Sequence, residues 1–163
     1  ELGKVLWVLM GSIGIVLLFM MVYYEVGGAI ADVMVLLHIM FLFATQAFFE
    51  AALTLPGIAA VALNTGMAVD ANVLVNERIR EELRNGKSPR VAVEQGFQRA
   101  FSSIFDSQIT TLIAAIVLFQ YGTGPIKGFA VTLGAGIIIS LYTSLIVGKM
   151  IFSYRRKATS LSI

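Results

Sequence analysis

Runs of about 20 apolar residues constrain this chain more than any other feature of its sequence. The first run reads VLWVLMGSIGIVLLFMMVYY, from Val5 to Tyr24, and later runs reach similar lengths. A helix needs about 20 apolar residues to cross the ~30 Å hydrocarbon core of a bilayer, whereas a helix of a soluble protein carries a single apolar stripe. Because 58% of the residues are hydrophobic and only 13% are charged, we expect an all-α integral membrane protein.

The hydropathy pattern predicts five transmembrane helices within a membrane domain over residues 1–157, followed by a tail at 158–163. Gly27 and Gly28 interrupt the pattern after the first span, and Asp32 bounds the second. Pro56 occupies a first-turn position that helices tolerate. The fourth span must include Asp106, because the purely apolar stretch behind it is too short to cross. The predicted spans are about 5–24, 33–49, 57–76, 102–120 and 129–150.

A charged stretch over residues 77–101 separates the third and fourth spans. Its beginning is predicted to extend the third helix, with Gly86 at the helix end. Ser88 and Pro89 then form the N-cap and first turn of a separate short helix. An apolar stripe predicts that this short helix lies along the membrane surface. The stripe consists of Val93, Phe97 and Phe101.

Basic residues in the short loops predict the orientation of the chain, because they favour the cytoplasmic side. Only Lys4 and Lys127 lie on the opposite side. The charged loop and the C-terminus are therefore expected in the cytoplasm, and the N-terminus outside. The basic residues of the loop and tail are Arg78, Arg80, Arg84, Lys87, Arg90, Arg99, Arg155, Arg156 and Lys157.

Asp70 is the most unusual residue of the predicted spans. It lies ~5 Å to the cytoplasmic side of the midplane of the third span, at 1.5 Å of rise per residue. A central aspartate costs roughly 2.5–3.5 kcal/mol on insertion scales, which favours a functional carboxylate able to bind and release a proton. A structural hydrogen bond or ion pair is the alternative. Gly66, one turn earlier, would let a neighbouring helix approach closely.

Asp106 is the second membrane carboxylate, and it shares one face of the fourth span with Ser103 and Thr110. It is a candidate relay group, with Thr111 nearby as a further polar residue. The alternative is an acid that only stabilises the first turns of its helix through the helix dipole.

Other polar and small residues of the spans are expected to serve helix packing. Asn72, Asn76 and Asn64 are predicted to form interhelical hydrogen bonds, and His38 to be a buried histidine with satisfied hydrogen bonds. Lys149 is expected to extend to the cytoplasmic interface. Small residues of the last span that favour close helix contacts are Gly134, Ala135, Gly136 and Gly148.

Motifs for other chemistry are missing from the sequence. It contains no phosphate-binding loop, no metal-ligand cluster and no pairing of a nucleophile with a base. We therefore expect no cofactor, no metal and no enzymatic activity. Acidic residues interrupt the basic loop, which argues against a nucleic-acid partner.

Several long motifs resemble the SecD family of the bacterial SecDF protein-export complex. They are LPGI from Leu55, AVDANVLVNERIREEL from Ala68, AFSSIFDSQITTL from Ala100 and GTGPIKGFA from Gly122. The first two spans match only in hydropathy. The resemblance implies half of a transmembrane bundle of the resistance-nodulation-division type, with this chain as spans two to six of a longer protein.

The resemblance also implies function and partners. Asp70 falls on the family's membrane aspartate, which is implicated in proton passage, and Asp106 falls in a second family motif. The implied activity uses the proton-motive force to draw exported polypeptide outward across the bacterial inner membrane. The implied partners are a SecF-like second half, a SecYEG-type channel, membrane lipid and a polypeptide held by a periplasmic domain. Two alternatives remain: a passive scaffold of the translocon, and half of a related small-molecule exporter.

Overall fold

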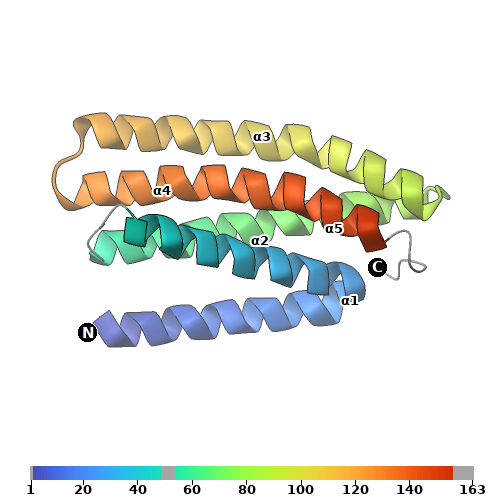
Figure 1. The fold of residues 1–163 in the computed structure, drawn as a ribbon, viewed down its shortest axis with the longest axis horizontal. Helices are drawn as coiled ribbons and strands as arrows, with labels where there is room; N and C mark the ends of the chain where they lie inside the picture. Colours follow the sequence, from blue (N-terminus) through green and yellow to red (C-terminus); the bar gives the residue numbers. More distant parts are fainter. Residues whose placement is uncertain (1, 49–53, 156–163) are drawn as a thin grey trace.

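The computed structural model describes residues 2–48 and 54–155, and all of the elements in these ranges are helices. The described ranges contain four helices that are long and apolar enough to cross a membrane, Gly3–Phe48, Leu55–Arg84, Pro89–Tyr121 and Pro125–Tyr154. Figure 1 draws the last of these as one continuous run of ribbon that carries the labels α4 and α5. The elements are α1 (Leu2–Phe48), α2 (Leu55–Arg84), α3 (Pro89–Tyr121), α4 (Pro125–Leu141), the π-helical η1 (Tyr142–Val147) and α5 (Gly148–Arg155).

Helix α1 is a hairpin of two arms. Its 47 residues would extend ~70 Å if straight, more than twice the ~30 Å hydrocarbon core of a bilayer. The helix is broken at Glu25, where φ is 47° and ψ is −111°. Residues 2–24 (the first arm) and 26–48 (the second arm) run in opposite directions (Figure 1). The predicted spans 5–24 and 33–49 both fall on α1, except for residue 49, which lies outside the described residues.

The reversal within α1 is tighter than the predicted turn between Glu25 and Asp32. Gly27 and Gly28 are helical residues of the second arm. A Cβ atom on Gly28 would lie 2.0 Å from the carbonyl oxygen of Met20, so this glycine lets the arms touch. The prediction that these glycines end the helical pattern was therefore wrong. Asp32 lies inside the second arm and is only 6% exposed.

Capping residues mark both ends of α2 and the start of α3, which follows α2 after a short turn. Thr54 caps α2 by accepting a hydrogen bond from the backbone N–H of Gly57 at 3.2 Å, and Pro56 lies in the first turn, as predicted. Gly86 follows the end of α2 with a φ of 80°, and Ser88 occupies the N-cap position of α3.

The predicted separate short helix after Ser88 is wrong, because residues 89–101 are the first part of the continuous helix α3. Its buried stripe runs through Val93, Phe97, Ala100 and Ile104 without a change of spacing. One face of α3 therefore stays in the core on both sides of residue 101, where the sequence predicted a boundary between the short helix and the fourth span.

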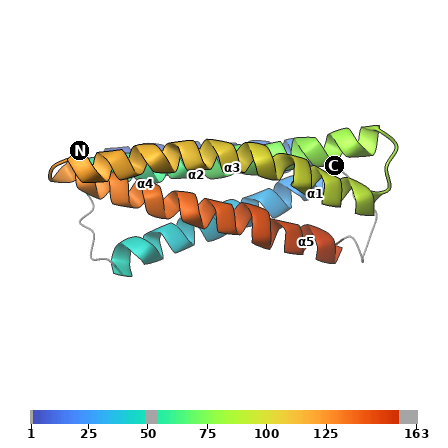
Figure 2. The same cartoon turned by 90° about the horizontal axis from the view of Figure 1, so that it is seen from above.

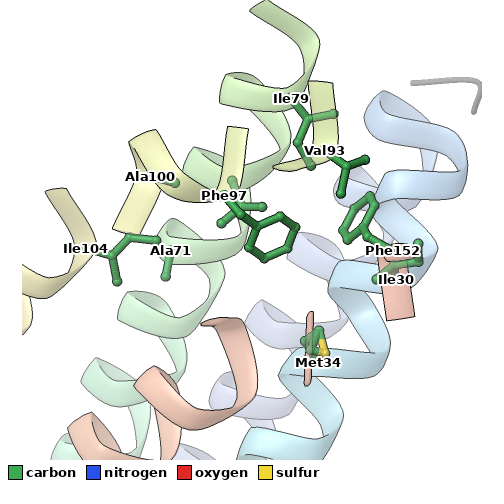
Figure 3. Packing of buried hydrophobic residues seen from close by; sticks show 10 residues of the cluster. Ile30, Met34, Ala71, Ile79, Val93, Phe97, Ala100, Ile104 and Phe152 are labelled. Atoms are coloured by element: carbon green, nitrogen blue, oxygen red, sulfur yellow. The ribbon is translucent and has the colours of Figure 1, made fainter. Parts of the chain in front are cut away.

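The largest apolar cluster lies near the α2–α3 turn and joins four elements (Figure 3). Phe97 of α3 and Phe152 of α5 meet edge to face, with ring centroids 5.6 Å apart. Gly96 lies so close to α2 that a Cβ atom there would come within 2.8 Å of the backbone nitrogen of Ile79. The buried members are Ile30, Met34, Ala71, Val75, Ile79, Val93, Phe97, Ala100, Ile104 and Phe152.

An ion-pair cluster links the end of α2 to the start of α3. The side chain of Glu82 is fully buried and pairs with Lys87 and with Arg99, whose Nη1 lies 2.8 Å from Oε1. Lys87 also donates a hydrogen bond to Gln95. A buried charge without a partner costs several kcal/mol, so these contacts favour the observed arrangement of the turn.

Helix α2 packs against α1, α3 and α4 and is the centre of the arrangement. Figure 2 shows the second arm of α1 inclined to α4 and α5. Asn64 donates a hydrogen bond to the carbonyl oxygen of Thr132 at 2.9 Å. A Cβ atom on Gly136 would lie 2.2 Å from the Asn64 side chain, so Asn64 fills the space that Gly136 leaves. These contacts confirm the predicted packing role of Asn64 and Gly136.

We predict that Gly136→Ala destabilises the protein by about 1–3 kcal/mol, because the added methyl group must displace the Asn64 side chain. Gly134→Ala is the matched control, because its Cβ atom would lie 3.8 Å from Leu112, an ordinary contact distance. The free energy of unfolding of the full-length protein, measured in mixed micelles, checks both. Equal losses in the two variants would contradict the packing role of Gly136.

We predict that Glu25→Gly preserves the stability of the α1 hairpin, whereas Glu25→Val lowers it by about 1–3 kcal/mol. A positive φ strains a residue with a side chain, and a β-branched residue most. Gly124 adopts nearly the same conformation, with φ 48° and ψ −117°. The same unfolding measurement checks this pair, and a Val variant as stable as the Gly variant would show that the backbone at residue 25 is not strained.

Candidate functional site

Asp70 lies on an exposed ridge of α2, between two clefts that it helps to line. It follows the small residue Gly66 by one turn and precedes the buried residue Ala71. Within residues 2–48 and 54–155, no hydrogen bond or ion pair reaches its carboxylate. Asp70 is thus an exposed carboxylate on a helix that is long and apolar enough to cross a membrane.

The larger cleft separates the first arm of α1 from α2 and has a volume of about 730 Å³. Its walls are almost entirely aliphatic, and Ser12, Thr65 and Asp70 are its polar side chains. The first arm packs against α2 near the reversal at Glu25, where Val16 and Val73 join a small cluster with Met20, Tyr24 and Ala31. Towards its N-terminal end the first arm leaves α2 uncovered.

The smaller cleft, of about 140 Å³, lies between α2 and α3. It brings Asp70 together with three polar residues of α3, Ser107, Gln108 and Thr111. Both hydroxyl groups donate to carbonyl oxygens of their own helix, Ser107 to Ile104 and Thr111 to Ser107, at 3.0 Å each. The Oε1 atom of Gln108 is buried and has no hydrogen-bond partner among the described residues. Helix α3 thus contributes two hydroxyl groups and one amide to the cleft that contains Asp70.

Gly66 lies in open space, contrary to the prediction that a neighbouring helix packs against it. No atom outside its own helix lies within 4 Å of a Cβ atom built there, as far as the described residues go. Gly66 instead lines the larger cleft beside Asp70. The surface of α2 at Gly66, which a helix could approach closely, is therefore not covered by the described helices of this chain.

Asp106 is exposed on α3, and the structure does not bring it to either cleft that contains Asp70. Ser103 and Thr110 are also exposed and lie within about one turn on either side of it, as predicted for residues of one helix face. The Thr110 hydroxyl donates to the Asp106 carbonyl oxygen at 2.9 Å. The two carboxylates thus line no common cleft among the described residues, and of the predicted supporting residues of α3 only Thr111 lies in a cleft with Asp70.

The asparagines of α2 have structural partners. Asn76 is buried and donates to the carbonyl oxygen of Gly27 in the second arm of α1, at 3.3 Å, which confirms an interhelical hydrogen bond. Asn72 is buried too, but it donates within its own helix to Ala68 at 2.9 Å. Asn76 therefore ties α2 to α1, whereas the prediction of an interhelical hydrogen bond was wrong for Asn72 as far as the described residues go.

Two polar residues of the second arm of α1, Asp32 and His38, are buried without a hydrogen-bond partner among the described residues, which the sequence did not predict. Asp32 is 6% exposed and His38 is fully buried. Neither carboxylate oxygen of Asp32 and neither ring nitrogen of His38 has a hydrogen-bond partner among the described residues. The prediction that His38 has satisfied hydrogen bonds was therefore wrong as far as the described residues go. The signal in the sequence was an acid and a histidine that keep helical spacing with the apolar residues Val35 and Leu42.

The described residues hold no group of three or more His, Cys, Asp or Glu side chains that could bind a metal ion. The chemistry that this site offers is that of a carboxylate at an apolar surface, next to hydroxyl and amide groups. Such a carboxylate can bind a proton or pair with a cation from another chain.

The chain has close relatives among protein-export subunits. The SecD subunit of a protein translocase from Syntrophobacter fumaroxidans is 51% identical over 158 residues, and the corresponding subunit from Desulfurispirillum indicum is 53% identical over 141 residues. These matches cover 95% and 86% of this chain, but only 30% and 27% of the relatives. The chain thus spans less than a third of the length of these relatives.

Solved structures and a family model agree with these relatives. The crystal structure of SecDF, a translocon-associated membrane protein from Thermus thermophilus, matches with a TM-score of 0.91 and 35% identity. That match covers 96% of this chain and 22% of the SecDF chain. The family model described as "Protein export membrane protein SecD/SecF, C-terminal" matches residues 2–158. The chain therefore belongs to the SecD/SecF C-terminal family of protein export membrane proteins.

Proposed function

We propose that this chain is the membrane half of a factor that uses the proton-motive force to drive Sec-dependent protein export, with Asp70 as its proton-carrying carboxylate. The observation that carries the proposal is the position of Asp70 on an uncovered ridge of α2, between two clefts and without a partner among the described residues. A membrane carboxylate is costly and marks a functional group by default. The family membership supplies the link to protein export.

The proposal includes five membrane crossings, two of them made by the arms of α1. Each arm has the length that a crossing needs. The basic residues gather near the α2–α3 turn, which lies at the same end of the molecule as α5 (Figure 1). Basic residues favour the cytoplasmic side, so we place this end in the cytoplasm and the N-terminus of the chain in the periplasm, with the protein in the bacterial inner membrane.

A SecF-like second half is the proposed cover for the ridge that carries Asp70. Its helices would close both clefts and supply the groups that exchange protons with the carboxylate. The exposed α3 face with Asp106, Ser103 and Thr110 adds a second polar surface, and we propose Asp106 as a further relay group. A SecYEG-type channel and the exported polypeptide complete the proposed set of partners.

Protonation of Asp70 would change the packing between the two halves. A proton moving down the field gains about 2.3 kcal/mol per 100 mV. Binding of that proton removes one negative charge from the interface of the halves. If the negative charge destabilises one arrangement of the two halves more than the other, its removal shifts the equilibrium between these arrangements. This shift would convert the proton gradient into motion of one half against the other.

We predict that Asp70→Asn, in the full complex, abolishes the export that depends on the proton gradient while the complex still assembles. The amide has the shape of the carboxylate but cannot bind and release a proton at neutral pH. Export into inverted membrane vesicles, with and without an uncoupler, measures the gradient-dependent part of the rate. Glu81→Gln is the matched control, because Glu81 is an exposed acid that is paired with Arg78 at the charged end of α2.

Two outcomes of this experiment contradict the proposal. A normal gradient-dependent rate in Asp70→Asn would show that Asp70 carries no proton. Loss of the complex on blue-native gels would favour a passive scaffold, in which Asp70 only pairs with a partner helix.

A further inference from the structure

A third cleft lies apart from Asp70, between α3 and the last helical segment. It has a volume of about 360 Å³. α3 contributes most of its lining, Leu145 belongs to η1 and Lys149 to α5. Figure 1 shows that the start of α3 and α5 lie at the same end of the molecule, the end with the basic α2–α3 turn. The lining residues are Glu94, Phe97, Gln98, Phe101, Leu145 and Lys149.

The floor of this cleft is apolar and well packed. Phe97 is 4% exposed and stacks edge to face on Phe152. A Cβ atom on Gly148 would lie 3.5 Å from the Phe97 ring, so the absence of a side chain there lets the ring lie against the last helical segment. Phe101 is 49% exposed and presents an aromatic surface at the side of the cleft.

The polar side chains of the cleft come from α3 and α5. Glu94, Gln98 and Phe101 follow one another at intervals of four and three residues, so they share one face of α3. Lys149 adds an ammonium group from α5. Glu94, Gln98 and Lys149 are all exposed, at the end of the helices where the sequence predicts the boundary between the membrane and the cytoplasm.

The two charges of the cleft are unpaired. Among the described residues, no ion pair within 4.0 Å joins Glu94 or Lys149 to any other side chain, or to each other. Lys87 and Arg99, by contrast, pair with acids of α2 at the neighbouring turn. The cleft thus offers a carboxylate, an amide and an ammonium group around an aromatic floor.

We propose that this cleft binds a zwitterionic phospholipid with a primary ammonium headgroup, of the phosphatidylethanolamine class. The lipid ammonium would donate hydrogen bonds to the Glu94 carboxylate, and Lys149 and Gln98 would donate to the lipid phosphate. Phe97, Phe101 and Leu145 would contact the glycerol and the first methylene groups. Basic pockets between transmembrane helices on the cytoplasmic side bind lipid headgroups, and Lys149 supplies the basic group of this cleft.

Charge complementarity selects this lipid over the other common classes. An anionic headgroup without an amine would pair with Lys149 but leave Glu94 facing a negative charge. A quaternary choline headgroup carries the positive charge but has no N–H group to donate. A primary ammonium and a phosphate on one headgroup satisfy both sides of the cleft.

Native mass spectrometry of the full-length protein tests the proposal, with an equimolar mixture of dioleoyl phosphatidylethanolamine, phosphatidylcholine and phosphatidylglycerol. We expect phosphatidylethanolamine to be retained about fivefold over phosphatidylcholine, a ratio of the size that one charge-assisted hydrogen bond provides. Glu94→Gln should remove this preference, and Glu94→Lys should shift it to phosphatidylglycerol. Arg90→Gln is the control, because Arg90 is exposed on α3 but lies outside the cleft.

Retention of phosphatidylethanolamine and phosphatidylcholine in equal amounts by the unaltered protein would overturn the proposal. A preference that persists in both Glu94 variants would overturn it too, since binding would then occur elsewhere. Because Glu94 is exposed, the variants are expected to fold, and circular dichroism of each sample checks this.

Discussion

The contacts of α2 with its neighbours are the constraint on which the rest of this structure depends. Asn64 reaches the backbone of α4, and Asn76 reaches the backbone of α1. In a membrane the hydrophobic effect does not drive helices together, so hydrogen bonds of this kind and close packing at small residues take its place. Gly136 and Gly96 supply that close packing on either side of α2.

In this arrangement one side of α2 is buried against the other helices, and the ridge with Asp70 stays uncovered. The asparagines and Ala68 are buried, whereas Gly66 and Asp70 are exposed. A carboxylate on the buried side would face the other helices of this chain rather than a second set of helices. On the uncovered side, its protonation state can respond to a second set of helices, which is what the proposed coupling needs.

The sequence predicted the helical class, the helix that carries Asp70 and the packing role of Asn64. A long apolar segment in a membrane must satisfy its backbone hydrogen bonds internally, as a helix does, and a polar side chain within it needs a partner or a function. It did not predict that α1 reverses at the single residue Glu25, since the Gly28 contact with Met20 that allows it is a tertiary feature. The same limit applies to the site. Apolar spacing alone does not reveal that Ser107 and Gln108, rather than Asp106, lie in a cleft with Asp70. The burial of Asp32 and His38 likewise depends on how the arms of α1 pack.

The central claim is that the ridge of Asp70 is the surface where a second half of the bundle binds. Labelling of this carboxylate with a hydrophobic carbodiimide, quantified by peptide mass spectrometry, tests that claim most directly. The account predicts that Asp70 is labelled when this protein is purified without SecF and is protected when the two are purified as a complex, while Glu94 is labelled equally in both. Equal labelling of Asp70 in the two samples would contradict it.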